Sequence, residues 1–148
     1  MVKTQKKNQY AIRAIFELAK HRGEGPIKIS AIAKAQSIPV RFLEVILNQF
    51  KGSGLVKSKR GFYGGYILIR RPEDISVGDI FRYMLRSVKS AECIACVSGN
   101  SCPFSGNCAF ASMWHKVNEA IFKIYDETTI QNLLDEEKKQ TLYPNVVI

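Results

Sequence analysis

Apolar residues near the N-terminus recur every three or four positions, which is the spacing of one face of a helix. Within residues 5–22, lysine and arginine occupy the opposite face. The pattern predicts an amphipathic helix whose buried face consists of Tyr10, Ala11, Ala14, Ile15, Leu18 and Ala19. A segment rich in glycine and proline, residues 23–26, ends this helix, and residues 27–29 are compatible with a short strand.

Two further helical segments follow, separated by a tight turn at residues 37–38. Ser30 is the expected N-cap of the first, which covers residues 31–36. Pro39 lies in the first turn of the second, where a missing N–H is tolerated, and this helix is predicted to end at about Lys51. Its buried face is predicted to comprise Leu43, Ile46, Leu47 and Phe50, and its other face Arg41, Phe42, Glu44, Asn48 and Lys51.

Two short helices joined by a tight turn form a helix-turn-helix, and in DNA-binding proteins its second helix lies in the major groove. The N-terminal residues of that helix would here be Arg41, Phe42 and Glu44. An arginine can bind guanine, a glutamate can accept a hydrogen bond from cytosine, and an aromatic ring can pack on a thymine methyl group. Any helical bundle contains helix pairs, so this pattern alone is weak support for DNA binding.

The next segment predicts a β-hairpin. Residues 55–58 and 66–69 are short β-prone runs, and residues 59–65 between them are basic, aromatic and glycine-rich. Such a hairpin would be the wing of a winged helix, with Arg60 at its tip placed for the minor groove or the phosphates. An ordinary surface hairpin is the alternative. The order of helix, helix-turn-helix and basic hairpin favours DNA binding.

Helical patterns also dominate the rest of the chain. Residues 76–79 open a helix that carries Ile80, Phe81, Met84 and Leu85. A later apolar stripe contains Phe110, Met113, Trp114, Val117, Ala120, Ile121 and Ile124, and all of these except Ala120 are predicted dimer contacts. A helix of about 18 residues spans roughly 27 Å, which is long for one small domain, so a second subunit is expected to cover the stripe. Packing within the monomer is the alternative. Thr129 is a candidate cap for a last helix over residues 130–137.

Charge is unevenly distributed along the 148 residues, whose formal net charge is +9. Residues 1–90 carry 18 Lys or Arg against 6 Asp or Glu, a net of +12, and residues 91–148 carry 4 against 7, a net of −3. A strongly basic front half suits a polyanionic partner, although charge alone decides nothing. No apolar run approaches the length needed to span a bilayer, so we expect a soluble cytoplasmic protein without a membrane partner.

The fold class predicted from these patterns is mainly α with a small β-hairpin wing. A winged helix-turn-helix DNA-binding domain is expected over residues 1–90 and a cysteine-rich loop over residues 91–108. A long dimerisation helix and a short C-terminal helix are expected over residues 109–137, and an irregular tail over residues 138–148. The hydrophobic fraction of 46% suits one globular domain with an appendage.

All four cysteines lie within one short segment, with the spacing Cys93-x2-Cys96-x5-Cys102-x5-Cys108. Glycine, proline, serine and asparagine between them predict a loop, which can point several thiolates at one centre. Thiolate is the ligand that soft metals and iron–sulfur clusters select. Disulfides are disfavoured because the N-terminus has no apolar signal sequence, and a role in core packing is disfavoured because the cysteines cluster. A metal or cluster site is therefore favoured.

Motifs typical of enzymes are missing from the sequence. It contains no Ser/His/Asp arrangement, no phosphate-binding loop and no pair of carboxylates in a glycine-rich setting. His21 lies among charged residues on the first helix, and His115 lies on the flank of the apolar stripe. Both are interpreted as structural or solvated residues, and the chain is not expected to be an enzyme.

Four elements together resemble one family: residues 38–44, residues 60–66, residues 75–80 and the cysteine segment. They are similar to the IscR/NsrR/RirA-type regulators, the BadM–Rrf family of winged-helix transcription factors, from Thr4 to about Leu134. The resemblance implies a homodimeric repressor or activator that binds a pseudo-palindromic operator in double-stranded DNA. It also implies an iron–sulfur cluster that senses iron, cluster supply, oxygen or nitric oxide.

The same resemblance assigns roles to residues of the first domain. Arg41, Phe42 and Glu44 look like the base-reading positions of the family, and Arg60-Gly61 looks like its minor-groove wing motif. The predicted DNA contacts are Ser30, Arg41, Phe42, Glu44, Asn48, Lys59, Arg60 and Gly61.

The cysteine pattern departs from that of the family. Sensing members carry three cysteines, commonly with five residues between neighbours, as Cys96, Cys102 and Cys108 have here. Cys93 stands at the usual distance of the first ligand from the preceding helix, so the loop carries an insertion and a spare thiol.

The non-cysteine ligands of two family branches are also not matched. One branch uses a histidine three residues after the last cysteine, where this chain has Ala111, and His115 would be displaced along a helix by roughly 10 Å. Another branch uses a carboxylate from the N-terminal helix, where this chain has Asn8 and Gln9.

The preferred hypothesis is a site made by four thiolates, those of Cys93, Cys96, Cys102 and Cys108. Four cysteines can hold either a [2Fe–2S] or a [4Fe–4S] cluster. A structural zinc ion at the same cysteines is one alternative. A metal-free thiol redox switch at Cys93 and Cys96 is another.

Overall fold

The structure is a computed structural model that describes residues 3–85, 103–104 and 107–142. Within these ranges the chain is mainly helical with one two-stranded antiparallel hairpin, so the predicted fold class is confirmed. In chain order the elements are α1 (Lys3–Lys20), α2 (Ile29–Gln36), α3 (Val40–Lys51), β1 (Val56–Lys59), β2 (Gly65–Leu68), the 3₁₀ helix η1 (Pro72–Asp74), α4 (Val77–Leu85), α5 (Ala111–Glu127) and α6 (Ile130–Leu142). None of the described helices is long and apolar enough to cross a lipid bilayer.

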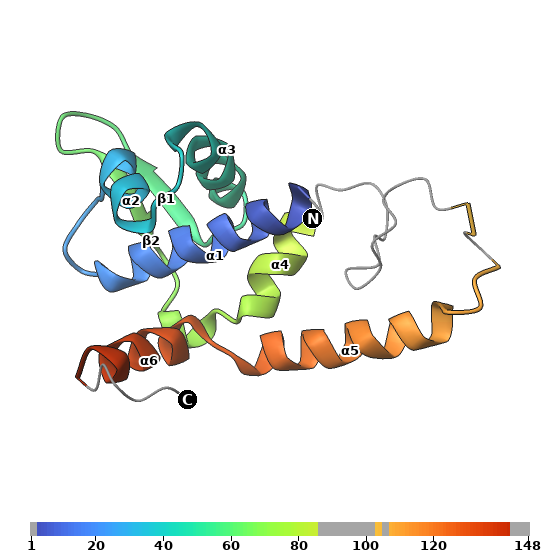
Figure 1. The fold of residues 1–148 in the computed structure, drawn as a ribbon. Helices are drawn as coiled ribbons and strands as arrows, with labels where there is room; N and C mark the ends of the chain where they lie inside the picture. The colour runs from blue at the N-terminus through green and yellow to red at the C-terminus, as the bar shows by residue number, and fades with distance from the viewer. Residues whose placement is uncertain (1–2, 86–102, 105–106, 143–148) are drawn as a thin grey trace.

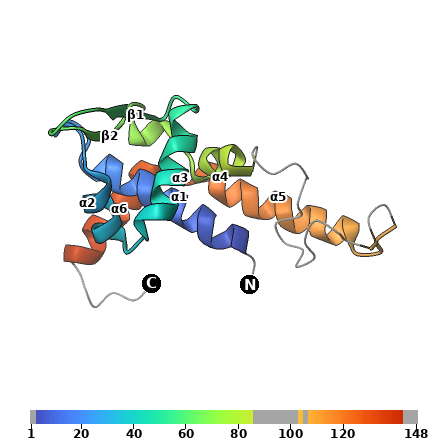
Figure 2. The ribbon, with the colours of Figure 1, turned by 90° about the horizontal axis from the view of Figure 1, so that it is seen from above.

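Helix α1 runs through the middle of the molecule (Figure 1). The helices α2 and α3 and the β1–β2 hairpin lie on one side of it, and α5 and α6 lie on the other. In both views α5 projects past the N-terminal end of α1 and away from the hairpin (Figures 1 and 2). The predicted DNA-reading elements and the predicted dimerisation helix are therefore on opposite sides of α1.

The core forms around α1 because the apolar face of this helix is continuous. The predicted face is buried at Ala11, Ala14, Ile15, Leu18 and Ala19, and Tyr10 is half-buried. Its small alanines let neighbouring helices approach, and α1 contacts α2, α3, α4 and α6. The predicted inner face of α3 fills the same core with no exposed surface at Leu43, Ile46, Leu47 and Phe50.

The strand considered for residues 27–29 is a single bridge. Ile27 exchanges two backbone hydrogen bonds with Tyr66 of β2, with N···O distances of 3.0 and 2.8 Å. Gly65 approaches Ile27 so closely that a Cβ atom on Gly65 would overlap the backbone of Ile27. The bridge thus fastens the segment before α2 to the hairpin.

The prediction that Ser30 caps α2 is wrong. This helix begins at Ile29 with Lys28 as its N-cap and with no side-chain cap bond, so Ser30 is an exposed residue of its first turn. The bridge at Ile27 keeps the backbone extended as far as Lys28, and the helix begins as soon as the chain leaves the bridge. Pro39 similarly is the N-cap of α3, one residue before the predicted first turn.

Both strands of the hairpin lie within one residue of their predicted positions. The register pairs Lys59 with Gly65 next to the tip, and the N–H of Gly64 donates to the carbonyl oxygen of Gly61 at 2.9 Å. Gly64 is buried, and a Cβ atom there would overlap the backbone of Lys59 and Gly61. Glycine is needed at this position because the tip folds back on itself.

Helix α6 is capped at Thr129 as the sequence predicts, and α4 begins with a cap of the same kind. Ser76 and Asp79 exchange side-chain to backbone hydrogen bonds of 3.0 and 3.1 Å, a capping box that opens α4. Thr129 and Asn132 do the same at α6, with distances of 3.1 and 2.9 Å. However, α6 continues to Leu142 instead of ending at residue 137, because the added residues contain no glycine or proline to stop a helix. The rest of the predicted tail, residues 143–148, lies outside the described residues.

Candidate nucleic-acid interface and cysteine site

The first turn of α3 presents a cation and an aromatic ring together. The Arg41 guanidinium lies over the Phe42 ring, with 4.9 Å between the guanidinium carbon and the ring centroid. The Phe42 ring lies 6.1 Å from the Tyr10 ring of α1, yet Phe42 remains exposed. Cation–π contact and ring packing restrict the motion of both side chains. The Arg41 guanidinium and the Phe42 ring are thereby presented side by side on the surface.

The remaining predicted residues of the helix-turn-helix are also accessible. Ser30, Glu44 and Asn48 are all exposed. Lys51, at the end of α3, is exposed too, and its Nζ lies 5.7 Å from the centroid of the Tyr66 ring on β2. This contact joins the outer part of α3 to the hairpin.

The tip of the hairpin is exposed, cationic and aromatic. Lys59, Arg60 and Gly61 are exposed, and Gly61 has φ 109°, a left-handed backbone conformation that favours glycine. Phe62 and Tyr63 are 79% and 83% exposed and contact each other edge to face, with 5.0 Å between ring centroids. These two rings were not among the predicted contacts, although aromatic residues in a glycine-rich tip were a usable signal.

A second contact ties this tip to the helix-turn-helix. The Lys28 Nζ, at the start of α2, lies 5.0 Å from the centroid of the Phe62 ring. The two contacts of Lys28 and Lys51 with aromatic rings therefore connect α2, α3 and the hairpin on the surface.

The segment that carries these elements is almost free of acidic residues. Residues 25–72 contain nine Lys or Arg and one acidic residue, Glu44, which gives a net charge of +8. A surface of this charge attracts a polyanion over several ångströms and makes binding dependent on salt concentration. The described geometry is suited to nucleic acid.

The apolar stripe of α5 is not covered by its own chain. No residue of α5 is buried. Phe110, Met113, Val117 and Ile124 are exposed, with Ile124 at 63%, while Trp114 and Ile121 are half-buried. The alternative in which the stripe packs wholly inside the monomer is therefore wrong for the described residues. Coverage by a second subunit stays a prediction.

The C-terminal end of α5 is fastened to α4 by a bidentate ion pair. Arg82 donates two hydrogen bonds to Asp126, each 2.6 Å long, and its guanidinium lies 5.0 Å from the Phe122 ring centroid. The Arg82 guanidinium lowers the pKa of the Asp126 carboxyl below its usual value through these hydrogen bonds. Gly78 lacks the Cβ atom that would overlap the Asp126 carboxylate. The Phe81 and Tyr125 rings add an edge-to-face contact at 4.6 Å.

Of the four predicted cysteine ligands, the structure describes one. Cys108 is a half-buried free thiol, and its carbonyl oxygen accepts a hydrogen bond of 3.1 Å from the N–H of Ala111, the first residue of α5. Cys93, Cys96 and Cys102 lie outside the described residues. Among the residues that are described, no three His, Cys, Asp or Glu side chains gather into a metal site.

The two histidines have the structural or solvated character predicted for them. His115 is exposed on α5, and its Nε2 lies 3.4 Å from Glu119 Oε1. His21 is half-buried and contacts two carboxylates, those of Glu17 and Glu24.

Comparison with known proteins decides the family. The family model Rrf2, described as an iron-dependent transcriptional regulator, matches residues 4–136. The chain belongs to the Rrf2 family. The family resemblance predicted from the sequence is thus confirmed, and the protein is an Rrf2-family transcriptional regulator.

Relatives within the family bear different names. The chain is 31% identical over 132 residues to the HTH-type transcriptional regulator CymR of Bacillus subtilis, covering 89% of each chain. The solved structure of that CymR, titled the global cysteine regulator of B. subtilis, matches with a TM-score of 0.69 over 92% of this chain and 98% of that one. The HTH-type transcriptional regulator IscR of Pectobacterium atrosepticum is 28% identical, over 89% of this chain and 79% of the relative.

A solved structure of T. potens IscR covers this whole Rrf2-family chain. It matches with a TM-score of 0.74 and 33% identity, over 100% of this chain and 93% of that one. The winged-helix fold is therefore shared with both IscR and CymR.

Proposed function

We propose that this Rrf2-family regulator binds a pseudo-palindromic operator as a homodimer, with α3 in the major groove and the hairpin tip at the minor groove or the phosphates. The observation that carries the proposal is the surface made by the exposed face of α3 and the basic tip, built from a segment of net charge +8. The elements that carry this surface lie on the other side of α1 from α5 (Figure 1). A dimer joined through α5 can therefore keep both surfaces free for DNA.

The residues divide between base reading and backbone contact. Arg41 and Glu44 are suited to base edges, Phe42 to a thymine methyl group and Asn48 to an adenine or a phosphate. Ser30 at the start of α2 is suited to a phosphate. Lys59, Arg60 and Gly61 form the wing contact, in which a positive charge and close backbone approach favour a narrow groove.

The apolar stripe of α5 supplies the dimer interface in this proposal. Exposed apolar residues repeat along the helix, and the same stripe of a second subunit matches them in chemistry. The half-sites of the operator must then lie about one helical turn apart. A change in the tilt of α5 alters that distance and hence the affinity for the operator.

We further propose that Cys93, Cys96, Cys102 and Cys108 hold an iron–sulfur cluster. The described ligand fits, because Cys108 is a free and half-buried thiol directly ahead of α5. When bound, a cluster supplies iron- or redox-dependent chemistry. The chain contributes the thiolates and the backbone hydrogen bond from Ala111 to Cys108, through which order at Cys108 extends into α5.

A regulator without a cluster is the second candidate. The similarity to CymR, whose structure is titled the global cysteine regulator, favours it. In this case the cysteines form a thiol redox switch at Cys93 and Cys96, or hold a structural zinc ion.

Purification without oxygen distinguishes these candidates. A cluster gives brown protein with visible absorption, iron and labile sulfide, whereas zinc gives colourless protein, and a thiol switch loses titratable thiols on mild oxidation.

If the cluster acts as the signal, loaded wild type and the Cys102→Ala variant should differ in operator affinity by about 5- to 150-fold. Ser112→Ala, an exposed change on α5, is the control and should behave as wild type. Identical titration curves for Cys102→Ala and wild type would contradict cluster sensing.

A further inference from the structure

One carboxylate is buried beneath the helix-turn-helix. Glu17 is 4% exposed and is the only buried polar or charged residue in the part of the chain that the structure describes. An ionised carboxylate is costly to bury unless partners satisfy its charge and its oxygens. The partners of Glu17 therefore show which elements of the fold this carboxylate connects.

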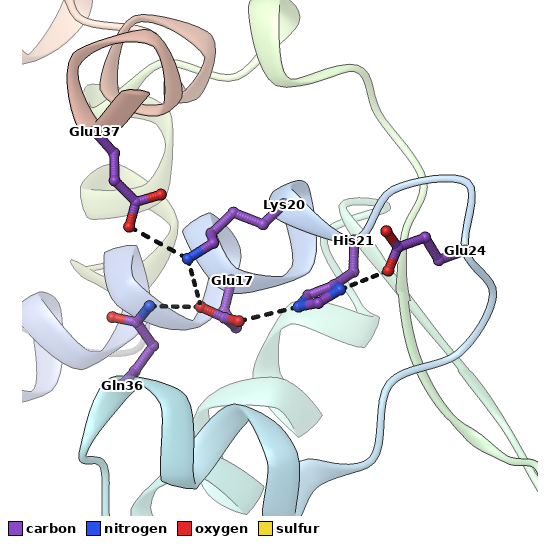
Figure 3. Close-up of polar contacts among 6 residues, drawn as sticks. All are labelled: Glu17, Lys20, His21, Glu24, Gln36 and Glu137. Carbon is purple, nitrogen blue, oxygen red and sulfur yellow. Dashed lines mark hydrogen bonds and ion pairs between the residues drawn. The ribbon is translucent and has the colours of Figure 1, made fainter. Parts of the chain in front are cut away.

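The first partner lies at the turn of the helix-turn-helix. The Gln36 side chain donates a hydrogen bond of 2.6 Å from Nε2 to Glu17 Oε2 (Figure 3). Gln36 is the last residue of α2, and Ser37 follows in a left-handed conformation with φ 52°. The Ile38 N–H then donates to Ala33 at 3.0 Å. Glu17 thus contacts α2 at the point where the chain turns toward α3.

The second partner lies between two carboxylates. His21 Nε2 is 3.1 Å from Glu17 Oε1, and His21 Nδ1 is 2.6 Å from Glu24 Oε2. A neutral imidazole has a single N–H, so both hydrogen bonds form only when the ring is protonated. The hydrogen bond to Glu24 raises the pKa of His21 above its usual value, against the opposing effect of burial and with further support from Glu17.

The third partner connects the site to α6. Lys20 Nζ lies 3.7 Å from Glu17 Oε2 and 3.2 Å from Glu137 Oε1 (Figure 3). The groups around His21 are therefore Glu17 and Lys20 on α1, Glu24 in the following loop, the neutral Gln36 on α2 and, through Lys20, Glu137 on α6.

We propose that Glu17 is a positioning residue that, with His21 protonated, holds the helix-turn-helix turn at Gln36 to α1 and, through Lys20, to α6. Loss of the His21 proton removes one of the two hydrogen bonds and leaves the buried carboxylate with less compensation. The turn at Gln36 is then less fixed, and the orientation of α3 varies more. The consequence for operator recognition rests on the proposed function, whereas the effect on the turn does not.

The sign of the pH dependence follows from the direction of the shift. The pKa of His21 in the folded protein is raised above 6.5. The stabilisation that His21 provides is therefore complete below pH 6.5 and is lost as the pH rises through the pKa of the folded protein. The contacts at Glu17 are therefore expected to be more stable when His21 is protonated at low pH and less stable when it is neutral at high pH.

Amide exchange and histidine NMR test the site without DNA. The chain has two histidines, so both rings can be followed from about pH 5.5 to about pH 9. After correction for intrinsic rates, exchange of the Ile38 amide in the wild type should rise about tenfold as His21 deprotonates. His21→Gln should exchange at the faster rate at every pH. Glu137→Gln should give a smaller increase, because the Lys20–Glu137 pair is partly exposed.

His115→Gln is the matched control, since His115 also lies four residues from a glutamate on a helix but is exposed. It should leave the Ile38 profile unchanged. At low pH, where His21 is protonated in the wild type, equal exchange of Ile38 in His21→Gln and wild type would overturn the proposal. A His21 pKa at or below 6.5 would overturn it too. A change in His115→Gln as large as that in His21→Gln would overturn it as well.

The DNA measurement separates positioning from simple loss of folded protein. The ratio of operator affinity to non-specific DNA affinity should fall about tenfold in His21→Gln at low pH, whereas partial unfolding lowers both affinities together. An unchanged ratio would overturn the positioning role. If wild type binds no duplex DNA, the proposed function fails, and the site at Glu17 is decided by the Ile38 exchange alone.

Discussion

Helices α3 and α5 are both amphipathic in sequence, yet they bury their apolar residues differently. The inner face of α3 is wholly enclosed by α1, α2 and the hairpin, whereas α5 has no buried residue along its length. An apolar stripe therefore indicates that something covers it, without telling whether the cover belongs to the same chain. In α3 the cover is the protein's own core. In α5 the described residues do not provide it.

The two halves of the chain that contain α3 and α5 also differ in net charge. The front half, residues 1–90, carries a net charge of +12, and residues 91–148 carry −3. The basic half holds the surface proposed for DNA, and the acidic half holds the stripe proposed for the dimer. In the proposed complex, phosphate charge would repel this acidic half from the duplex.

The largest expected effect belongs to the enclosed helix. Phe50 is fully buried and stacks on Tyr83 with 5.5 Å between ring centroids. Phe50→Ala should lower the free energy of unfolding by about 3–5 kcal/mol, because it removes apolar contacts and leaves a cavity. Urea denaturation measures this loss. Val45→Ala, an exposed change on the same helix, should alter the free energy by less than about 0.5 kcal/mol. Equal losses in the two variants would contradict the described core.

A substitution on the exposed stripe of α5 should weaken dimerisation without lowering the stability of the folded subunit. Ile124→Glu puts a charge on the stripe of α5 and should weaken dimerisation by about 2–3 kcal/mol, since an unpaired charge is poorly tolerated in an interface. Sedimentation equilibrium measures the dissociation constant. Lys123→Glu, at the exposed neighbouring position, should have little effect. A dimer of unchanged affinity in Ile124→Glu would show that the stripe serves another purpose.

The smallest expected effect concerns DNA binding by the wing, where an ionic and an aromatic side chain can be compared. Arg60→Ala should weaken DNA binding by about 1 kcal/mol and lower the salt dependence by about one released ion, because one phosphate-directed charge is lost. Phe62→Ala should weaken binding without changing the salt dependence. Fluorescence anisotropy at several salt concentrations measures both. Ile69→Ala, exposed beyond the other end of β2, is the control. If Phe62→Ala also lowered the salt dependence of DNA binding, the assignment of an ionic role to Arg60 and a non-ionic role to Phe62 would be contradicted.

Much of the winged helix could be predicted because its signals are local. The period of Ala11, Ala14, Ile15 and Leu18 defines the inner face of α1, and Thr129 caps α6 within a few residues of its partner. The wing was predicted within one residue per strand because two short β-prone runs flank a glycine-rich tip.

The error at Ser30 arose because a distant segment overrides a local preference. Ser30 is a good N-cap by residue type, but the bridge between Ile27 and Tyr66 fixes the backbone so that α2 begins at Ile29. The ion pair of Arg82 and Asp126 joins residues 44 positions apart, and no local pattern indicates it.

The sequence by itself determined the helices, the hairpin, the basic front half and the cysteine segment, since periodicity, caps and composition act over a few residues. Only the tertiary structure decided which stripe is enclosed and which is open, and that Glu17 lies among Gln36, His21 and Lys20. Burial and pairing of charges depend on segments brought together by packing, and a single residue type does not encode its neighbours in space.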